Sequence, residues 1–123
     1  MAYLWIALGA VAGASARYFL SGFIAKVLPS GFPYGTLLIN ITGSMLLGFF
    51  LAWTSERVLI DPRWRLLIAI GFCGSYTTFS SYAFETIALG EQGQWLLVGM
   101  NVIGSNLLGL VSVLAGIALA RWQ

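Results

Sequence analysis

Four long apolar segments, separated by short polar loops, are the feature of this sequence that most constrains its fold. They cover approximately residues 3–23, 36–53, 64–89 and 95–122, and each is long enough to cross a bilayer as a helix. With 59% hydrophobic and 8% charged residues, the composition lies far outside that of soluble domains. Because the segments use nearly all of the 123 residues, the sequence predicts one all-α membrane domain, residues 1–123, with four transmembrane helices.

Side chains suited to catalysis are scarce. The chain has one cysteine, Cys73, and no histidine, which excludes an internal disulfide and argues against a transition-metal site or a Cys/His nucleophile. The six basic residues are scattered or lie at segment ends, so the net charge of +2 does not indicate a nucleic-acid surface. We therefore expect a function within the bilayer and no enzymatic activity.

The third segment contains a stretch that a plain lipid-facing helix does not carry. Residues 71–85 read GFCGSYTTFSSYAFE, with two glycines and five serine or threonine residues. Unpaired backbone groups at membrane depth cost several kcal/mol each, so such a stretch survives only where protein or a polar cavity covers it. The sequence therefore predicts that the third helix is broken in mid-membrane and that this break is the working part of the molecule.

Two other segments each carry a polar stripe on one helical face. The stripe of the second segment is made of Thr36, Asn40, Gly43, Ser44 and Leu47. That of the fourth is made of Asn101, Ser105, Leu108 and Ser112, with Asn106 pointing about 140° away from Asn101. Such residues either join helices by hydrogen bonds or offer N–H and O–H groups to a passing anion.

The polar groups in these segments favour an anion over a cation as the solute. They are amides and hydroxyls with almost no acid, whereas cation pathways are lined by acidic side chains or by rings of carbonyls. Phe79, Tyr82 and Thr86 share a face of the third segment, and aromatic rings present a positive edge that suits a small, hard anion. A packing stripe is the alternative interpretation of this face.

Charged residues and freed carbonyls add three further hypotheses. Arg17 lies well inside the first segment, where a guanidinium snorkels, pairs or marks a polar cavity. Glu85 is expected to reach the headgroup region or to cap a cavity mouth. Carbonyls released around Gly74 and Thr77 are hard oxygen ligands that suit an alkali cation.

The distribution of basic residues fixes the orientation of the chain only weakly. An even number of segments puts both termini on one side, with four basic residues on that side against two on the other: Arg57, Arg63, Arg65 and Arg121 against Arg17 and Lys26. Chains inserted in both orientations would be able to pair as an antiparallel dimer with two-fold symmetry.

Three motifs together resemble those of the CrcB/Fluc fluoride channels. GFCGSYTTFSSYAFE looks like the signature of that family's third helix, and GTLLINITGS is similar to its G-T-x-x-x-N element. Gly13, Ala14, Arg17 and Tyr18 match its first-helix G-A-x-x-R-Y pattern. The resemblance covers the whole chain in length, segment count and motif order. It implies a multi-pass protein of a bacterial plasma membrane that exports cytoplasmic fluoride passively and so relieves fluoride toxicity.

The resemblance also implies an assembly and a set of site residues. The assembly is a dual-topology antiparallel homodimer in the lipid bilayer, with two fluoride pores and one structural Na⁺ held by backbone carbonyls, here those of Gly74 and Thr77. The implied pore residues are Asn40, Phe79, Ser80, Ser81, Tyr82 and Ser105, and Arg17 matches the arginine near the aqueous entry. Ser75, Tyr76 and Tyr82 depart from the family pattern, and Tyr82 adds a hydroxyl where the family has its second phenylalanine.

Two other functions compete with a fluoride channel at this stage. A small four-helix drug or cation exchanger shares the length and the dual-topology dimer, but such exchangers use a membrane-embedded glutamate in the first helix. This chain has Arg17 there instead. A non-transporting subunit of a larger membrane assembly would use the polar stripes only to join helices.

Overall fold

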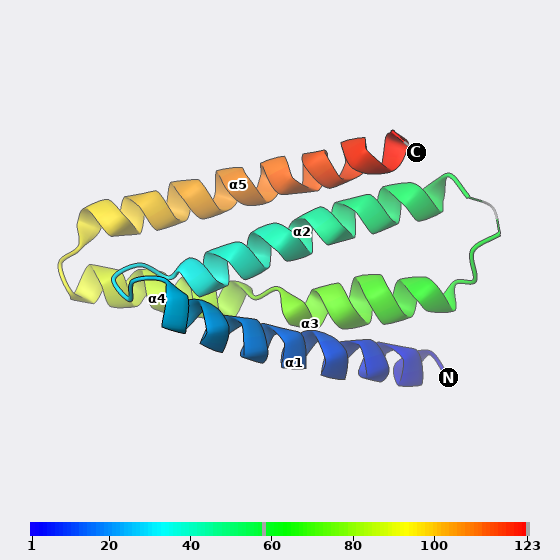
Figure 1. The fold of residues 1–123 in the computed structure, drawn as a ribbon, viewed down its shortest axis with the longest axis horizontal. Coiled ribbons are helices and arrows are strands. Elements are labelled where there is room, and N and C mark those ends of the chain that lie inside the picture. Colours follow the sequence, from blue (N-terminus) through cyan, green and yellow to red (C-terminus); the bar gives the residue numbers. More distant parts are fainter. Residues whose placement is uncertain (58, 123) are drawn as a thin grey trace.

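The computed structural model describes residues 1–57 and 59–122, and this part of the chain consists of helices and short connections. The helices are α1 (Ala2–Val27), α2 (Tyr34–Ser55), the π-helix η1 (Arg65–Cys73), α3 (Gly74–Tyr76), α4 (Phe79–Glu91) and α5 (Trp95–Arg121). They lie along one long axis as an elongated bundle, with both termini at the same end (Figure 1). The all-helical fold predicted from the sequence is confirmed.

Three helices, α1, α2 and α5, are long and apolar enough to cross a membrane. The segment predicted over residues 64–89 is not one long helix like these three. It is divided among η1, α3 and α4, which follow one another along the bundle (Figure 1). α1 and α2 extend a few residues beyond the ranges predicted for the first two segments, and α5 ends one residue earlier than predicted.

Prolines set the boundary between α1 and α2. α1 ends at Val27, and Leu28 is extended with φ −109° and ψ 154°. Leu28 precedes Pro29, and a residue before proline is sterically disfavoured in the helical region. α2 begins at Tyr34, directly after Pro33. The loop predicted here from its proline and glycine content is confirmed.

Glycines allow the backbones of α1 and η1 to touch. A Cβ atom built on Gly9 would collide with the carbonyl oxygen of Leu67, and one built on Gly71 would lie 2.6 Å from the carbonyl oxygen of Ile6. A Cβ on Gly13 would likewise collide with the carbonyl of Phe72. The close helix approach predicted from the spacing of Gly9 and Gly13 is therefore confirmed.

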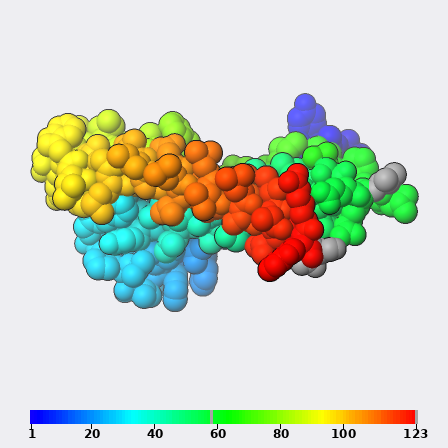
Figure 2. Space-filling model, turned by 90° about the horizontal axis from the view of Figure 1, so that it is seen from above, coloured from blue at the N-terminus to red at the C-terminus, as the bar shows by residue number. Residues whose placement is uncertain are grey.

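Much of the exterior is apolar. α2 packs most extensively against α5, and α1 against η1. α5, coloured from yellow-orange to red, runs across much of the face shown in Figure 2. Its exposed side chains include Leu96, Ile103, Leu107, Leu110 and Leu114. Such a surface suits lipid or another apolar protein face rather than water.

Charged residues gather at the end of the bundle that holds both termini. The Asp61 carboxylate accepts hydrogen bonds from the backbone N–H and Nε of Arg63, which hold the pKa of Asp61 below its usual value. Arg121 and Glu56 approach to 3.6 Å, so the end of α5 meets the end of α2. The predicted aqueous turn over residues 55–65 thus has its charges at the bundle end, with Val58 outside the described residues.

Candidate functional site

The helical path between α3 and α4 is interrupted at two threonines. Tyr76 ends α3, Thr77 (φ −79°, ψ 156°) and Thr78 (φ −148°, ψ 125°) are extended, and Phe79 begins α4. The Thr77 backbone N–H and hydroxyl both donate to the carbonyl of Cys73, at 3.1 and 2.8 Å. The backbone of Thr78 leaves the helical pattern altogether and needs other partners.

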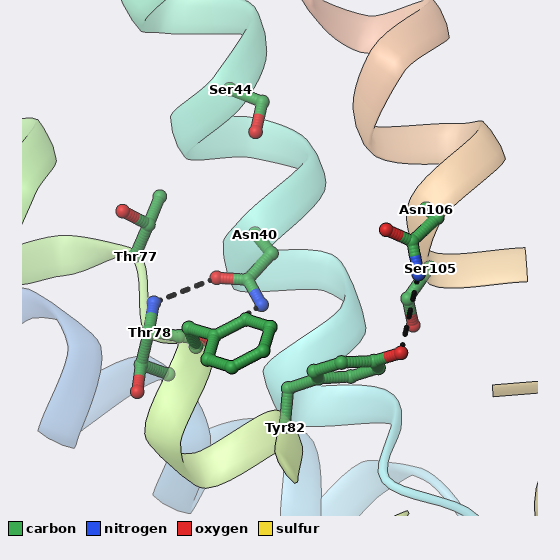
Figure 3. Close-up of a pocket in the computed structure, with 8 residues that line it drawn as sticks. Asn40, Ser44, Thr77, Thr78, Tyr82, Ser105 and Asn106 are labelled. Atoms are coloured by element: carbon green, nitrogen blue, oxygen red, sulfur yellow. Dashed lines mark hydrogen bonds between the residues drawn. The ribbon is translucent and has the colours of Figure 1, made fainter. Parts of the chain in front are cut away.

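Asn40 on α2 supplies those partners. Its Nδ2 donates to the carbonyl oxygen of Thr78 at 2.9 Å, and its Oδ1 accepts from the Thr78 N–H at 2.8 Å (Figure 3). One step along the same face of α2, a Cβ on Gly43 would collide with the methyl group of Thr77. Asn40 and Gly43, two members of the polar stripe predicted on the second segment, therefore face the interruption.

Thr78 also caps the following helix. Its Oγ1 accepts a hydrogen bond from the backbone N–H of Ser81 at 3.2 Å, as expected of a threonine at the position before a helix. The first N–H groups of α4 have no partner within the helix, and the positive end of its dipole lies there. The interruption thus directs backbone donors and a partial positive charge toward the side chains around it.

A cavity of about 250 Å³ opens at the interruption (Figure 3). Its lining comes from α2, the interruption, α4 and α5: Asn40, Ser44, Thr77, Thr78, Phe79, Tyr82, Ser105 and Asn106. All eight residues are neutral, and seven of them carry an amide or a hydroxyl group. The cavity therefore offers hydrogen-bond donors without an acidic group that would repel an anion.

Two aromatic rings and an amide form one wall of the cavity. The ring centroids of Phe79 and Tyr82 are 5.6 Å apart, with the planes tilted by 51°. Nδ2 of Asn106, on α5, donates to the Tyr82 hydroxyl at 3.2 Å (Figure 3). It also donates to the carbonyl of Val102 at 2.7 Å. Asn106 is not among the site residues predicted from the sequence. The one signal for it was its direction, which differs from that of Asn101 by about 140° and so indicated that it faces a different neighbour.

Asn101 has the interhelical role that the sequence left open. It is 2% exposed, its Nδ2 donates to the Thr86 hydroxyl at 2.8 Å, and its Oδ1 accepts from the Ser105 hydroxyl at 3.0 Å. Thr86 in turn donates to the carbonyl of Tyr82 at 2.7 Å. Asn101 therefore joins α5 to α4 behind the cavity, and Ser105 lines the cavity with its own proton already donated.

Four of the six residues predicted for the pore lie around the same cavity. Asn40, Phe79, Tyr82 and Ser105 line the one cavity. Ser80 and Ser81 lie in the first turn of α4 outside that lining, and the Ser80 hydroxyl is 3.3 Å from that of Thr78.

Arg17, predicted at the aqueous entry, contacts the segment just before the interruption. Its Nε donates to the carbonyl oxygen of Ser75 at 3.1 Å, and its side chain is partly buried. The guanidinium thus pairs with a backbone carbonyl inside the bundle, which is one of the ways in which arginine is accommodated in a membrane segment.

The carbonyls of Gly74 and Thr77 have both lost their helical partners. The Thr78 N–H, which would bond Gly74 in a continuous helix, donates to Asn40, and the Ser81 N–H, which would bond Thr77, donates to the Thr78 hydroxyl. Gly74 is exposed, and a Cβ built on it would come no closer than 3.9 Å to another atom. Hard, neutral oxygens in this position fit an alkali cation.

Glu85 lies at a second cavity, formed beside the loop between α1 and α2. The cavity measures about 320 Å³, and its lining includes Thr36, Tyr34, Ser21 and Glu85. The Thr36 hydroxyl donates to Oε1 of Glu85 at 2.6 Å. The carboxylate is therefore held to α2 at the wall of this cavity.

Known proteins of one family match this chain along nearly its whole length. The family model described as "CrcB-like protein, Camphor Resistance (CrcB)" matches residues 4–117. The chain is similar to a protein of Koribacter versatilis named fluoride-specific ion channel FluC, at 60% identity over 119 residues, 97% of this chain and 94% of the relative. Proteins of the same name from Trichormus variabilis (50% identity, 94% and 85% covered) and a Sulfurihydrogenibium species (43%, 97% and 96%) are also similar.

Proposed function

Because this chain belongs to the CrcB-like family, we propose that it is a fluoride-specific ion channel, a multi-pass membrane protein through which cytoplasmic fluoride leaves passively. The observation that carries the proposal is the neutral, donor-rich cavity at the interruption between α3 and α4. The relatives that bear the name FluC are bacterial, which supports a place in a bacterial plasma membrane.

The chemistry of the cavity suits a small anion. Asn40 uses one of its two N–H groups on Thr78, so the second N–H is available to a solute. The start of α4 adds backbone N–H groups and the positive end of a helix dipole. Fluoride, a small anion and a strong hydrogen-bond acceptor, gains more from such donors than a larger halide does.

The proposed pore residues act in three ways. Asn40 donates to the anion while it holds the interruption open, and Phe79 presents the positive edge of its ring. The hydroxyls of Ser80 and Ser81, with Tyr82 and Ser105, continue the polar track along α4 and α5. Arg17, whose Nε donates to the Ser75 carbonyl, adds positive charge beside the interruption, which favours the arrival of anions.

We propose that the channel is an antiparallel dual-topology homodimer in which the interruption lies at mid-membrane depth. Both termini lie at one end of the bundle, as an even number of crossings requires (Figure 1). The weak bias in basic residues allows insertion in both orientations. The exposed backbone at Gly74 provides a surface on which two interruptions would be able to meet across a two-fold axis.

We further propose one structural Na⁺ at that axis, with the carbonyls of Gly74 and Thr77 as its ligands. Both carbonyls lack their helical partners, because the amides of Thr78 and Ser81 donate elsewhere. The cation would supply a fixed positive charge that joins the two chains at their interruptions. The residues of this chain would hold it through backbone oxygens, so no titratable side chain would be needed.

Fluoride efflux from liposomes that contain the purified protein tests the function. An ion-selective electrode should record rapid fluoride release, with chloride release from matched liposomes close to the level without protein. Fluoride release equal to that of protein-free liposomes would refute the channel. Release that requires an opposing cation gradient would support the alternative, a small drug or cation exchanger.

A further inference from the structure

The Tyr82 side chain has a polar contact that its aromatic ring alone would not need. Its phenol oxygen accepts a hydrogen bond from Nδ2 of Asn106 at 3.2 Å, across the gap between α4 and α5 (Figure 3). Both residues line the cavity at the interruption. The hydroxyl is therefore held on the cavity wall by a residue of a different helix.

Several donor protons around this contact are already used within the protein. Asn106 has two N–H groups on Nδ2, and they donate to Tyr82 and to the carbonyl of Val102. Ser105, the neighbouring hydroxyl, gives its proton to Asn101. The Tyr82 oxygen acts as an acceptor in its contact with Asn106, so its own proton remains available to an acceptor in the cavity.

The surroundings of this hydroxyl favour an anionic acceptor. The eight residues that line the cavity are neutral, so among the described residues of the lining no carboxylate competes for the proton. Phe79 lies beside the Tyr82 ring at a centroid separation of 5.6 Å, so an anion against this wall would meet the phenylalanine edge and the tyrosine hydroxyl together. A hydrogen bond to a charged acceptor is about twice as strong as one between neutral groups.

We propose that the Tyr82 hydroxyl is a hydrogen-bond donor to the conducted anion and that Asn106 is the positioning residue that orients it. The inference rests on the proposed channel function and concerns how strongly the pore holds fluoride. Asn106 occupies one lone pair of the phenol oxygen, which directs the O–H away from α5 and into the cavity. The anion then has a subsite made by a side-chain donor of α4 in addition to the donors around Asn40.

The test compares the fluoride concentration that half-saturates efflux in four proteins: the parent, Tyr82→Phe, Asn106→Leu and the double variant. Tyr82→Phe keeps the ring and removes only the hydroxyl, so efflux should persist while the half-saturating concentration rises about tenfold, a typical effect of one hydrogen bond to a charged group. Asn106→Leu should shift it in the same direction by a smaller factor. In the Tyr82→Phe background, Asn106→Leu should add nothing, because it acts only through the hydroxyl.

Tyr3→Phe is the matched control, since Tyr3 is 86% exposed at the start of α1 and contributes nothing to the cavity. An unchanged half-saturating concentration in Tyr82→Phe would overturn the donor role. An equal effect of Asn106→Leu in both backgrounds would overturn the positioning role.

A binding measurement separates failure of the subsite from failure of the channel. Fluoride is titrated into the detergent-solubilised parent and Tyr82→Phe proteins, and the ¹⁹F resonance is followed. If the parent conducts nothing but Tyr82→Phe still weakens binding about tenfold, the proposed function fails and the donor site stands. If the parent neither conducts nor binds fluoride, both proposals fail.

Discussion

Asn40 makes a two-way hydrogen-bonded pair with the backbone of Thr78, donating to its carbonyl oxygen at 2.9 Å and accepting from its N–H at 2.8 Å. A carboxamide is the side-chain group that resembles a peptide unit, so Asn40 replaces the backbone partner that a continuous helix would have given Thr78. The pair explains how a polar interruption can persist in an apolar bundle. It also leaves one N–H of Asn40 for the cavity.

Replacing Asn40 should therefore damage both stability and conduction. Asn40→Asp retains an acceptor for the Thr78 N–H but loses the donor to its carbonyl and places a negative charge in the cavity, so fluoride efflux should be abolished. Asn40→Ala leaves both Thr78 groups unpaired, each at a cost of about 1–3 kcal/mol. Efflux from liposomes and the thermal midpoint in detergent measure the two effects.

Ser55→Ala serves as the control for Asn40, because the Ser55 hydroxyl, at the exposed end of α2, donates to the carbonyl of Ala52 in its own helix and lies outside the cavity lining. It should leave efflux and the thermal midpoint unchanged. Full efflux in Asn40→Asp would show that Asn40 is outside the conduction path, whatever the protein conducts.

Phe79 and Phe84 offer a matched pair of phenylalanines on one helix. They are 78% and 77% exposed, but only Phe79 lines the cavity. Phe79→Ile removes the aromatic edge while keeping an apolar side chain. Efflux should therefore fall at least about tenfold, which corresponds to a loss of about 1.4 kcal/mol in the passage of the anion. Phe84→Ile should conduct like the parent. Equal losses in both variants would assign the effect to general packing of α4.

The sequence was most informative where side-chain spacing alone decides which residues share a face. The four-residue spacing of Thr36 and Asn40 predicted one face of α2, and both side chains do reach toward α4 and its preceding interruption. Gly9 and Gly13 similarly predicted a close backbone contact, which the structure supplies at η1. Periodicity is reliable here because a regular helix fixes relative directions within itself.

Features that depend on how two helices are rotated against each other were not predictable. Asn101 and Asn106 lie about 140° apart on a regular helix, but the sequence does not say which of them meets the cavity. The structure buries Asn101 against Thr86 and puts Asn106 on the cavity wall. The nine-residue π-helix over 65–73 was also unexpected, because bonding to the fifth residue along the chain leaves no distinct side-chain pattern.

The contact of Gly9 with η1 gives a prediction about folding that is independent of conduction. An alanine methyl at Gly9 would collide with the backbone carbonyl of Leu67, which cannot rotate away as a side chain can. Gly9→Ala should therefore destabilise the fold by at least about 2 kcal/mol and lower the thermal midpoint. Gly22→Ala is the control, since a Cβ there meets no atom within 4 Å. A Gly9→Ala protein as stable as Gly22→Ala would contradict the tight packing.

The carbonyls of Gly74 and Thr77 lead to a prediction about sodium that does not depend on fluoride. If these oxygens hold Na⁺ between two chains, replacing Na⁺ with N-methylglucamine at constant ionic strength should lower the thermal midpoint in detergent, and restoring Na⁺ should reverse the change. The Phe79→Ile variant, in which efflux is expected to be impaired, should show the same sodium-dependent shift, because the Phe79 side chain is not one of the proposed cation ligands. A midpoint that ignores Na⁺ in both proteins would argue against a cation at the interruption. A shift in the parent alone would instead connect the sodium effect to the anion cavity, since only the lining of that cavity differs between the two proteins.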